Sequence, residues 1–309
     1  MKHLIKILIL ISCFSMAACN IYEQFKEELY KNEFCLVAGS DNIYSVSIPF
    51  DDEVYEGFVS IYCGGTNPVT NDVTIELEYD LESIQEYNEL TFDLDVSRYA
   101  KRFDPSRYEI PTFSATMKAG QENPSVTIPI RIFTEGITPD TIFFIPLKIK
   151  SITEGYDFNP EMDKLLYRPF VENKYASTMK QTIYGLRGKR NGVEITGSKN
   201  AYPLAANQIR TTVEKYTELD GNNRVNLDLI NKYSIKITVN SDNTLTLEPY
   251  GTIEIEQLGN TEDNKLEIKD LTRFYLYYRY RTLETPKTED KDAVYSNWVE
   301  VEEVLRRQN

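Results

Sequence analysis

The stretch Ser125-Val126-Thr127-Ile128-Pro129-Ile130-Arg131-Ile132 decides the fold class, because apolar residues occupy every second position. Side chains along a strand point alternately to the two faces of a sheet, so this spacing predicts a strand with one buried face. Residues 42–49 and 73–79 alternate in the same way, and residues 142–149 form another strand-like segment. Roughly seven short strands with turn signals between them are typical of an immunoglobulin-like β-sandwich, which we expect over residues 32–153.

The second half of the chain also carries strand patterns. Residues 234–239 and 244–249 flank Asn240-Ser241-Asp242-Asn243, which is predicted to be a four-residue hairpin loop. A meander of about six to eight strands protects its edges best by closing on itself, so residues 173–309 are predicted to form an antiparallel β-barrel. Residues 154–172 are expected to link the two domains, and one short helix is expected at residues 81–90 or 97–102. The predicted fold is therefore all-β with two domains.

Several short motifs resemble a known family of two-domain proteins. Four motifs occur in order in the sandwich region: Tyr108-Glu109-Ile110-Pro111, Met117-Lys118-Ala119-Gly120, Thr127-Ile128-Pro129-Ile130 and Phe144 to Ile149. Two more lie in the barrel region: Tyr175-Ala176-Ser177-Thr178 and Tyr184 to Gly188. They resemble Bacteroidota surface lipoproteins encoded with polysaccharide-utilisation systems. In these an immunoglobulin-like domain of unknown function precedes a lipocalin-like barrel. The resemblance implies glycan capture at the cell surface, with outer-membrane uptake proteins as partners.

Residues 1–18 have the layout of a secretory signal peptide. Lys2 and Lys6 flank the start of a short apolar run that ends in small residues. The run is well below the ~20 residues of a membrane-spanning helix. Met16-Ala17-Ala18-Cys19 resembles the bacterial lipobox, although Met16 departs from the usual leucine, and this resemblance implies cleavage before Cys19 and lipidation of its thiol. Attached acyl chains would then anchor the protein on a membrane, whereas ordinary cleavage beside an incidental cysteine is the alternative.

Residues 19–31 are expected to form a lipidated tether. Asn20 is not the aspartate associated with inner-membrane retention, which favours the outer membrane. Glu23, Glu27 and Glu28 resemble the acidic export tag of Bacteroidota surface lipoproteins, although a solvated tether accounts for them equally well. We therefore expect an outer-membrane lipoprotein exposed at the cell surface, with a periplasm-facing orientation as the alternative.

The composition argues against most catalytic chemistry. The only histidine is His3, inside the signal peptide, so Ser-His and Cys-His catalysis and His-ligated zinc are excluded from the mature chain. Removing Lys2 and Lys6 leaves 32 basic against 48 acidic residues, a net charge of −16 that disfavours nucleic acid. The acidic cluster Asp51-Asp52-Glu53 lacks the ligand spacing of a calcium loop. The sequence thus predicts no enzyme, no metal and no cofactor.

Two cysteines remain in the folded part of the chain, Cys35 and Cys63. An exported protein can form a disulfide, and both residues lie in strand-like stretches of the predicted sandwich. A Cys35–Cys63 bond and two buried free thiols are both compatible with the sequence.

The densest aromatic run, Arg273 to Arg281, supplies the candidate ligand residues. Strand alternation sends Phe274, Leu276, Tyr278 and Tyr280 to one face, expected to be core, and Arg273, Tyr275, Tyr277, Arg279 and Arg281 to the other. Sugars bind by stacking their C–H faces on aromatic rings, which makes Tyr275 and Tyr277 candidates, together with Trp298, the sole tryptophan. Cross-strand packing is the alternative for the tyrosines, and a core position or the barrel mouth for Trp298.

These observations favour a non-catalytic, surface-exposed lipoprotein that binds glycans. A carrier for an apolar small molecule inside the barrel, or an adhesin that contacts another protein, is the alternative. A glycosidase would require two carboxyl groups about 5–10 Å apart in an open cleft, and no acid pair stands beside the aromatic run.

Overall fold

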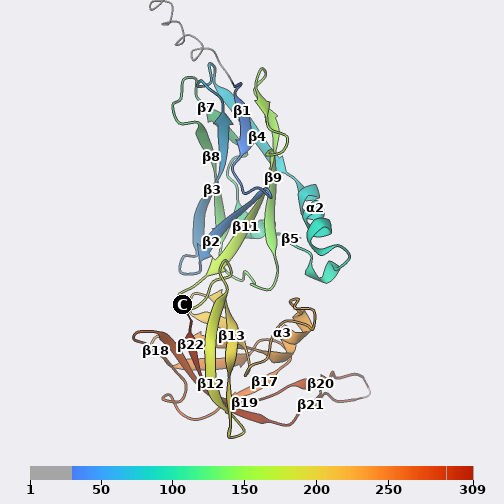
Figure 1. Ribbon diagram of the computed structural model, residues 1–309, viewed down its shortest axis with the longest axis vertical. Coiled ribbons are helices and arrows are strands. Elements are labelled where there is room, and N and C mark those ends of the chain that lie inside the picture. Colours follow the sequence, from blue (N-terminus) through green and yellow to red (C-terminus); the bar gives the residue numbers. More distant parts are fainter. Residues whose placement is uncertain (1–29, 290, 309) are drawn as a thin grey trace, which may run out of the picture.

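The structure is a computed structural model that describes residues 30–289 and 291–308 (Figure 1). The predicted signal peptide and Cys19 lie outside these residues. Two all-β domains are stacked along the long axis of the molecule, a sandwich and a barrel, as the sequence predicts. No helix in the described part of the chain combines the length and apolarity needed to cross a membrane.

The first domain contains two facing sheets. One sheet has the strand order β10-β1-β3-β8-β6, with β10 (Asp157–Phe158), β1 (Glu33–Leu36), β3 (Val54–Gly64), β8 (Ser125–Phe133) and β6 (Tyr108–Glu109). The other has the order β2-β11-β9-β4-β7, with β2 (Ile43–Pro49), β11 (Lys164–Glu172), β9 (Phe143–Ile152), β4 (Val73–Tyr79) and β7 (Ser114–Met117), while β5 (Lys101–Arg102) pairs with β9. Most pairs are antiparallel, but β2 runs parallel to β11, β10 to β1 and β5 to β9.

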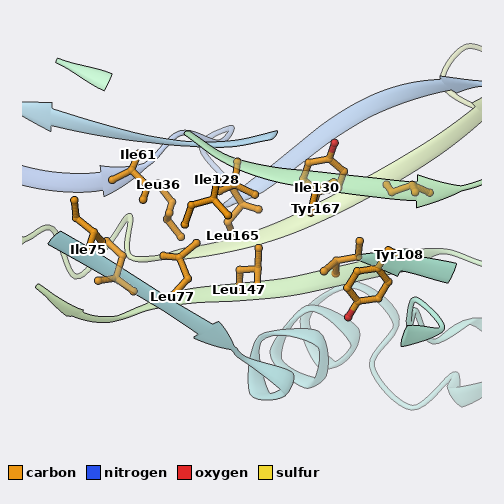
Figure 2. Close-up of a cluster of buried hydrophobic side chains, with 14 of the residues drawn as sticks. Leu36, Ile61, Ile75, Leu77, Tyr108, Ile128, Ile130, Leu147, Leu165 and Tyr167 are labelled. Carbon is orange, nitrogen blue, oxygen red and sulfur yellow. The ribbon is translucent and has the colours of Figure 1, made fainter. Parts of the chain in front are cut away.

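Alternation in the quoted stretch builds the sandwich core. Ile128, Ile130 and Ile132 of β8 are fully buried, whereas the intervening Pro129 and Arg131 are exposed. Figure 2 shows Ile128 and Ile130 packed with Ile61 and Leu147 between the two sheets, and Ile132 belongs to the same core. Fully burying one such side chain contributes about 1.5–3 kcal/mol, so this single strand accounts for several kcal/mol.

Residues 154–172 are not a linker. Most of this stretch forms β10 and β11, which complete the two sheets of the sandwich. The reason is apolar content, because Leu165, Tyr167 and Val171 on β11 are buried in the sandwich core. The chain therefore passes to the barrel after Glu172.

The helix α2 (Leu81–Phe92) is formed at the first of the two predicted positions. It packs on the outer face of the second sheet, where Tyr87 and Phe144 meet edge to face with ring centroids 4.8 Å apart. The second position instead holds the 3₁₀ turn η2 (Val96–Arg98), which leads into β5, and a further turn η3 (Pro105–Arg107) follows. This places the end of α2 and η2 at the lower side of the sandwich, toward the barrel (Figure 1).

The second domain is a nearly closed antiparallel barrel. Its strand order is β16-β15-β14-β13-β12-β22-β19-β17, with β18 also paired to β19; the bounds are β12 (Thr182–Arg190), β13 (Val193–Ala205), β14 (Gln208–Thr212), β15 (Ser234–Val239), β16 (Leu245–Pro249), β17 (Glu254–Gln257), β18 (Lys265–Ile268), β19 (Thr272–Arg281) and β22 (Val299–Arg307). The helix α3 (Leu227–Tyr233) precedes β15, and the hairpin β20 (Leu283–Thr285) and β21 (Val294–Tyr295) extends from the barrel.

The Gln257 side chain bridges the seam between β16 and β17, the two strands at the ends of the sheet order. The Gln257 side-chain amide donates to the Leu245 carbonyl (3.0 Å) and accepts from the Leu247 amide (3.0 Å). These bonds satisfy edge groups of β16 that would otherwise face solvent, which is the reason a meander closes. In the middle of the sheet order, Asn191 and Gly192 both have positive φ and form the two-residue turn that joins β12 to β13.

Cys35 and Cys63 are free thiols, so no disulfide joins them. Their strands are adjacent and antiparallel, but Cys63 lies opposite Phe34, and Cys35 lies opposite Tyr62. Side chains at positions offset by one residue point to opposite faces of a sheet, so the two sulfur atoms are on different sides. Burial raises the pKa of both thiols, which disfavours the reactive thiolate.

Candidate functional site

Burial along β19 confirms the predicted alternation. Phe274, Leu276, Tyr278 and Tyr280 belong to the barrel core and are at most 2% exposed. Tyr275 and Tyr277 point to the outer face of the barrel and are half-buried. The aromatic-basic stripe expected from the sequence therefore exists, on the outside of the barrel.

Tyr275 and Tyr277 both contact polar side chains of neighbouring strands. The Tyr277 hydroxyl donates to Glu300 Oε1 (2.8 Å), and the Lys265 ammonium lies 5.7 Å from the Tyr275 ring centroid. These contacts are the cross-strand packing that the sequence left as the alternative. Both tyrosines are therefore paired with side chains of neighbouring strands on the outer face of the barrel.

Trp298 lies beside the same stripe and is half-buried, so it is neither a core residue nor part of the barrel interior. Its ring is contacted by two guanidinium groups, with the Arg279 carbon 4.7 Å and the Arg281 carbon 4.9 Å from the ring centroid. Both arginines are also ion-paired, to Glu256 and Glu254. The tertiary fold thus brings Trp298 next to the predicted stripe, where cation–π contacts cover its ring.

A different site lies between the two domains, and sequence reasoning missed it. Its centre is Arg210 on β14, which is 1% exposed although it points away from the barrel core. One terminal nitrogen donates to Asp140 Oδ1 (2.6 Å) in the loop before β9 of the sandwich. The other donates to Glu218 Oε2 (3.0 Å) and Ser234 Oγ (3.3 Å) of the barrel domain. The sandwich therefore covers Arg210, and an ion pair crosses the domain boundary.

Two tyrosines enclose the Arg210 guanidinium. Its carbon lies 4.4 Å from the Tyr202 ring centroid and 5.4 Å from that of Tyr250. The Tyr202 hydroxyl donates to Glu218, and the Tyr250 hydroxyl donates to Asp140. Burial, and then the bond to Asp140, raises the pKa of Tyr250 to about 12, and burial likewise raises the pKa of Tyr202. Both phenols therefore stay protonated donors even at pH values where an ordinary tyrosine begins to ionise.

This cluster forms one wall of a cavity of about 200 Å³. The sandwich and the barrel both contribute lining residues, including Phe92, Ser97, Arg98, Tyr99, Lys101 and Asp140 from the former and Tyr202, Arg210, Glu218, Val225 and Leu227 from the latter. Arg210 Nε is buried and has no hydrogen-bond partner among the described residues. A buried donor without a partner costs free energy.

The cavity has the chemistry of a site for a small polar ligand. Aromatic and aliphatic side chains provide apolar walls, while hydroxyl, carboxylate and guanidinium groups provide both donors and acceptors. Domain interfaces are common places for such sites, although this volume is below the ~300–1,000 Å³ typical of drug-sized ligands. No cluster of metal-ligating side chains is present in residues 30–289 and 291–308.

The signal for this site in the sequence is weak. Its residues are spread from Phe92 to Leu227 and come from loops, a helix end and strands of both domains. Only Arg210 offered a local hint, because it stands among apolar and hydroxyl residues in the strand Gln208–Thr212. Its burial depends on the position of the other domain, which no local pattern encodes.

Comparisons with known proteins agree with this two-domain architecture. A family model described as an N-terminal domain matches residues 25–155, and another described as C-terminal matches residues 163–306. No curated protein matches the chain. A Bacteroides ovatus protein of unknown function is similar in structure, with a TM-score of 0.64 and 18% identity over 90% of this chain and 94% of its own.

Two further crystal structures extend the likeness. Another Bacteroides ovatus protein of unknown function has a TM-score of 0.57 and 14% identity, with 92% of each chain covered. An auxiliary nutrient binding protein from Bacteroides thetaiotaomicron has a TM-score of 0.50 and 18% identity, covering 88% of this chain and 95% of its own. At these identities the likeness establishes the shared fold alone.

Proposed function

We infer that this chain, a two-domain protein of the type found in Bacteroides, is a non-catalytic lipoprotein that binds glycan at the cell surface. The observation that carries the proposal is the cavity between the domains, where aromatic walls surround the Arg210 cluster. A sugar ring offers apolar C–H faces to aromatic walls and hydroxyl groups to donors and acceptors. The mixed charges of the site suit a neutral sugar, and the volume suits a single ring.

The barrel interior argues against the carrier alternative. Its centre is filled by aromatic and aliphatic side chains and by a buried ion pair between Lys199 and Glu303, with 2.6 Å between Nζ and Oε1. Small barrels whose interior is filled by side chains have a packed core in place of a ligand cavity. An apolar ligand would also have to displace charged groups that are paired only with each other and with polar neighbours.

Nutrient binding by a structural neighbour supports a binding role. The two carboxylates at the cavity, Asp140 and Glu218, are both occupied by the Arg210 guanidinium and by tyrosine hydroxyls. That arrangement fits groups that orient a ligand and position a cation. We therefore assign no reaction to the site. Lipidation at Cys19 and exposure at the outer membrane, with uptake proteins as partners, remain parts of the proposal.

Filling the cavity tests the proposed site. In the mature chain with Cys19→Ser, Leu227→Trp places an indole at a lining position that is 45% exposed. Binding measured by calorimetry and affinity electrophoresis across neutral mono- and oligosaccharides should weaken at least tenfold. Leu81→Trp is the matched control, because Leu81 also begins a helix and is 54% exposed, yet it does not line the cavity. Equal binding by both variants, or no binding by the parent, would contradict the proposal.

The anchor requires a separate test in the native host. Cys19→Ser should move the protein from the membrane fraction to the soluble fraction and abolish incorporation of labelled palmitate. Unchanged partitioning would rule out attachment through Cys19 without affecting the assignment of the cavity.

A further inference from the structure

A second hollow lies on the outer face of the barrel, and it shares no lining residue with the cavity between the domains. It measures about 840 Å³ and crosses β13, β12, β22 and β19. Its lining includes Gly185, Arg187, Thr196, Arg273, Val304 and Arg306. The hollow is open to solvent, and its volume falls within the ~300–1,000 Å³ range of ligand sites.

Arginine side chains gather there although the chain as a whole is strongly acidic. Arg306 on β22 lies directly opposite Arg273 on β19, and Arg187 on β12 lies one row along, opposite Val304. Arg307 also lines the hollow. Like charges directly opposite each other across strands are destabilising, so this arrangement is unfavourable for the barrel alone.

Acidic neighbours neutralise only part of this charge. Arg273 is ion-paired with Asp270 (2.9 Å) and Glu267 (3.4 Å) at one end of the hollow. Within the described part of the chain, Arg187 and Arg306 are exposed and lie within 4.0 Å of no carboxylate. Two guanidinium groups are therefore available for an anionic ligand.

Apolar and polar groups both line the hollow between and beside the arginines. Gly185 lies opposite Arg306 on the side away from Arg273, and the Gln308 side-chain amide lies over it, 2.9 Å from the position of an added Cβ. Val304, two residues before Arg306 on the same strand, and Leu271, two residues before Arg273, add aliphatic surface beside the arginines. A ring could thus lie against this aliphatic surface while its charged group reaches the guanidinium forks, which bind carboxylate and sulfate groups in a bidentate manner.

We propose that this hollow, lined by Arg187, Arg273 and Arg306, is a second binding site that takes an acidic sugar unit, carboxylated or sulfated, of a polysaccharide. A polysaccharide fits better than a membrane surface, because the hollow is concave and combines guanidinium groups with aliphatic surface. This site goes beyond the neutral sugar assigned to the cavity between the domains and does not depend on it.

Affinity electrophoresis of the mature Cys19→Ser chain tests the second site directly. Polygalacturonate and chondroitin sulfate should retard the protein, whereas dextran should give no retardation that depends on this hollow. Arg187→Gln with Arg306→Gln should weaken binding to the acidic polymers at least tenfold, and the remaining binding should depend less on salt. The melting temperature of this variant should not fall, because both side chains are exposed and a repulsion is relieved.

Two control variants separate this site from other causes. Arg131→Gln removes an exposed, ion-paired arginine from the sandwich and should leave the affinity for acidic polymers unchanged. Leu227→Trp fills the other cavity and should also leave it unchanged, so failure of either site is distinguishable from failure of the other. Lack of retardation by both acidic polymers, or an equal loss in Arg131→Gln, would overturn the proposal. Arginine-dependent binding to vesicles of anionic phospholipid without polymer binding would also overturn it, by assigning the hollow to lipid phosphate.

Discussion

Replacing Lys199 by Met should lower the free energy of unfolding of the barrel, because the substitution leaves the buried carboxylate of Glu303 without its cation. The Lys199 and Glu303 side chains are 1% and 0% exposed. Lys199 also donates to the Thr212 carbonyl (2.8 Å), and Tyr278 donates to Glu303 Oε1 (3.0 Å). Glu303 Oε2 has no partner among the described residues. The carboxylate therefore relies on one ammonium and one phenol inside the barrel.

The expected cost follows from this burial. Removing one partner of a buried ion pair costs about 3–5 kcal/mol, which corresponds to a fall in melting temperature on the order of 10 °C for a domain of this size. Urea unfolding and calorimetry of the mature Cys19→Ser chain measure both quantities. Lys199→Met with Glu303→Gln is the matched control. It removes both charges but keeps an acceptor for Tyr278, so it should recover most of the lost stability.

The same variant should show a defined pH dependence. Burial raises the pKa of Glu303 above its ordinary value of 4.5, and Lys199 opposes that rise. Without Lys199 the pKa in the folded state rises further. A raised carboxyl pKa contributes stability that is present below the unfolded pKa and is lost as pH rises through the folded pKa. The deficit of Lys199→Met relative to the parent should therefore be larger at pH 8 than at pH 5.

A loss below about 1 kcal/mol, or a deficit independent of pH, would refute this reasoning. Such values are typical of solvated charges, so they would mean that water or a ligand reaches the barrel interior. The carrier alternative would then regain support over the packed core described here.

Two further predictions concern the sandwich thiols and the barrel backbone. Unfolding the mature Cys19→Ser protein without reductant should expose two alkylatable thiols, Cys35 and Cys63. Alkylation of the folded protein at pH 8 should be slow, because burial raises the pKa of both thiols. A mass lower by two hydrogen atoms would show a disulfide and contradict the observed register. Gly188→Ala should cost about 1–3 kcal/mol in urea unfolding, since an added Cβ would lie 2.2 Å from the Glu302 carbonyl oxygen. Gly221→Ala is its control, with no atom within 4 Å of the added Cβ, and equal stability of the two variants would contradict the predicted clash.

Local patterns determined most of the secondary structure. The alternation in residues 125–132 predicted β8 and its buried isoleucines, and the alternation in residues 273–281 predicted which side chains of β19 enter the barrel. Both predictions depend only on the two-residue period of a strand, which any half-buried strand must obey. Closure of the second domain was also predictable, because a meander of short strands protects its edges by forming a barrel.

Pairing partners were less predictable than strands. The stretch 154–172 was expected to be a linker, yet β11 completes the sandwich by lying between β2 and β9. The sequence was compatible with a disulfide and with free thiols, and the strand register, in which Cys63 lies opposite Phe34, excludes the disulfide. A shift of one residue changes the face of every side chain, and the sequence of one strand does not state its register against another.

The sequence by itself determined an all-β chain of two domains, without histidine beyond His3 and with an excess of negative charge. Only the tertiary structure decided where the binding sites lie. Arg210 becomes a buried centre because Asp140 of the other domain reaches it, and Arg187 and Arg306 become a pair because β12 and β22 are neighbours. The physical reason is the same in both cases. A strand's own period specifies which residues face inward, whereas long-range packing specifies which distant residues share a surface.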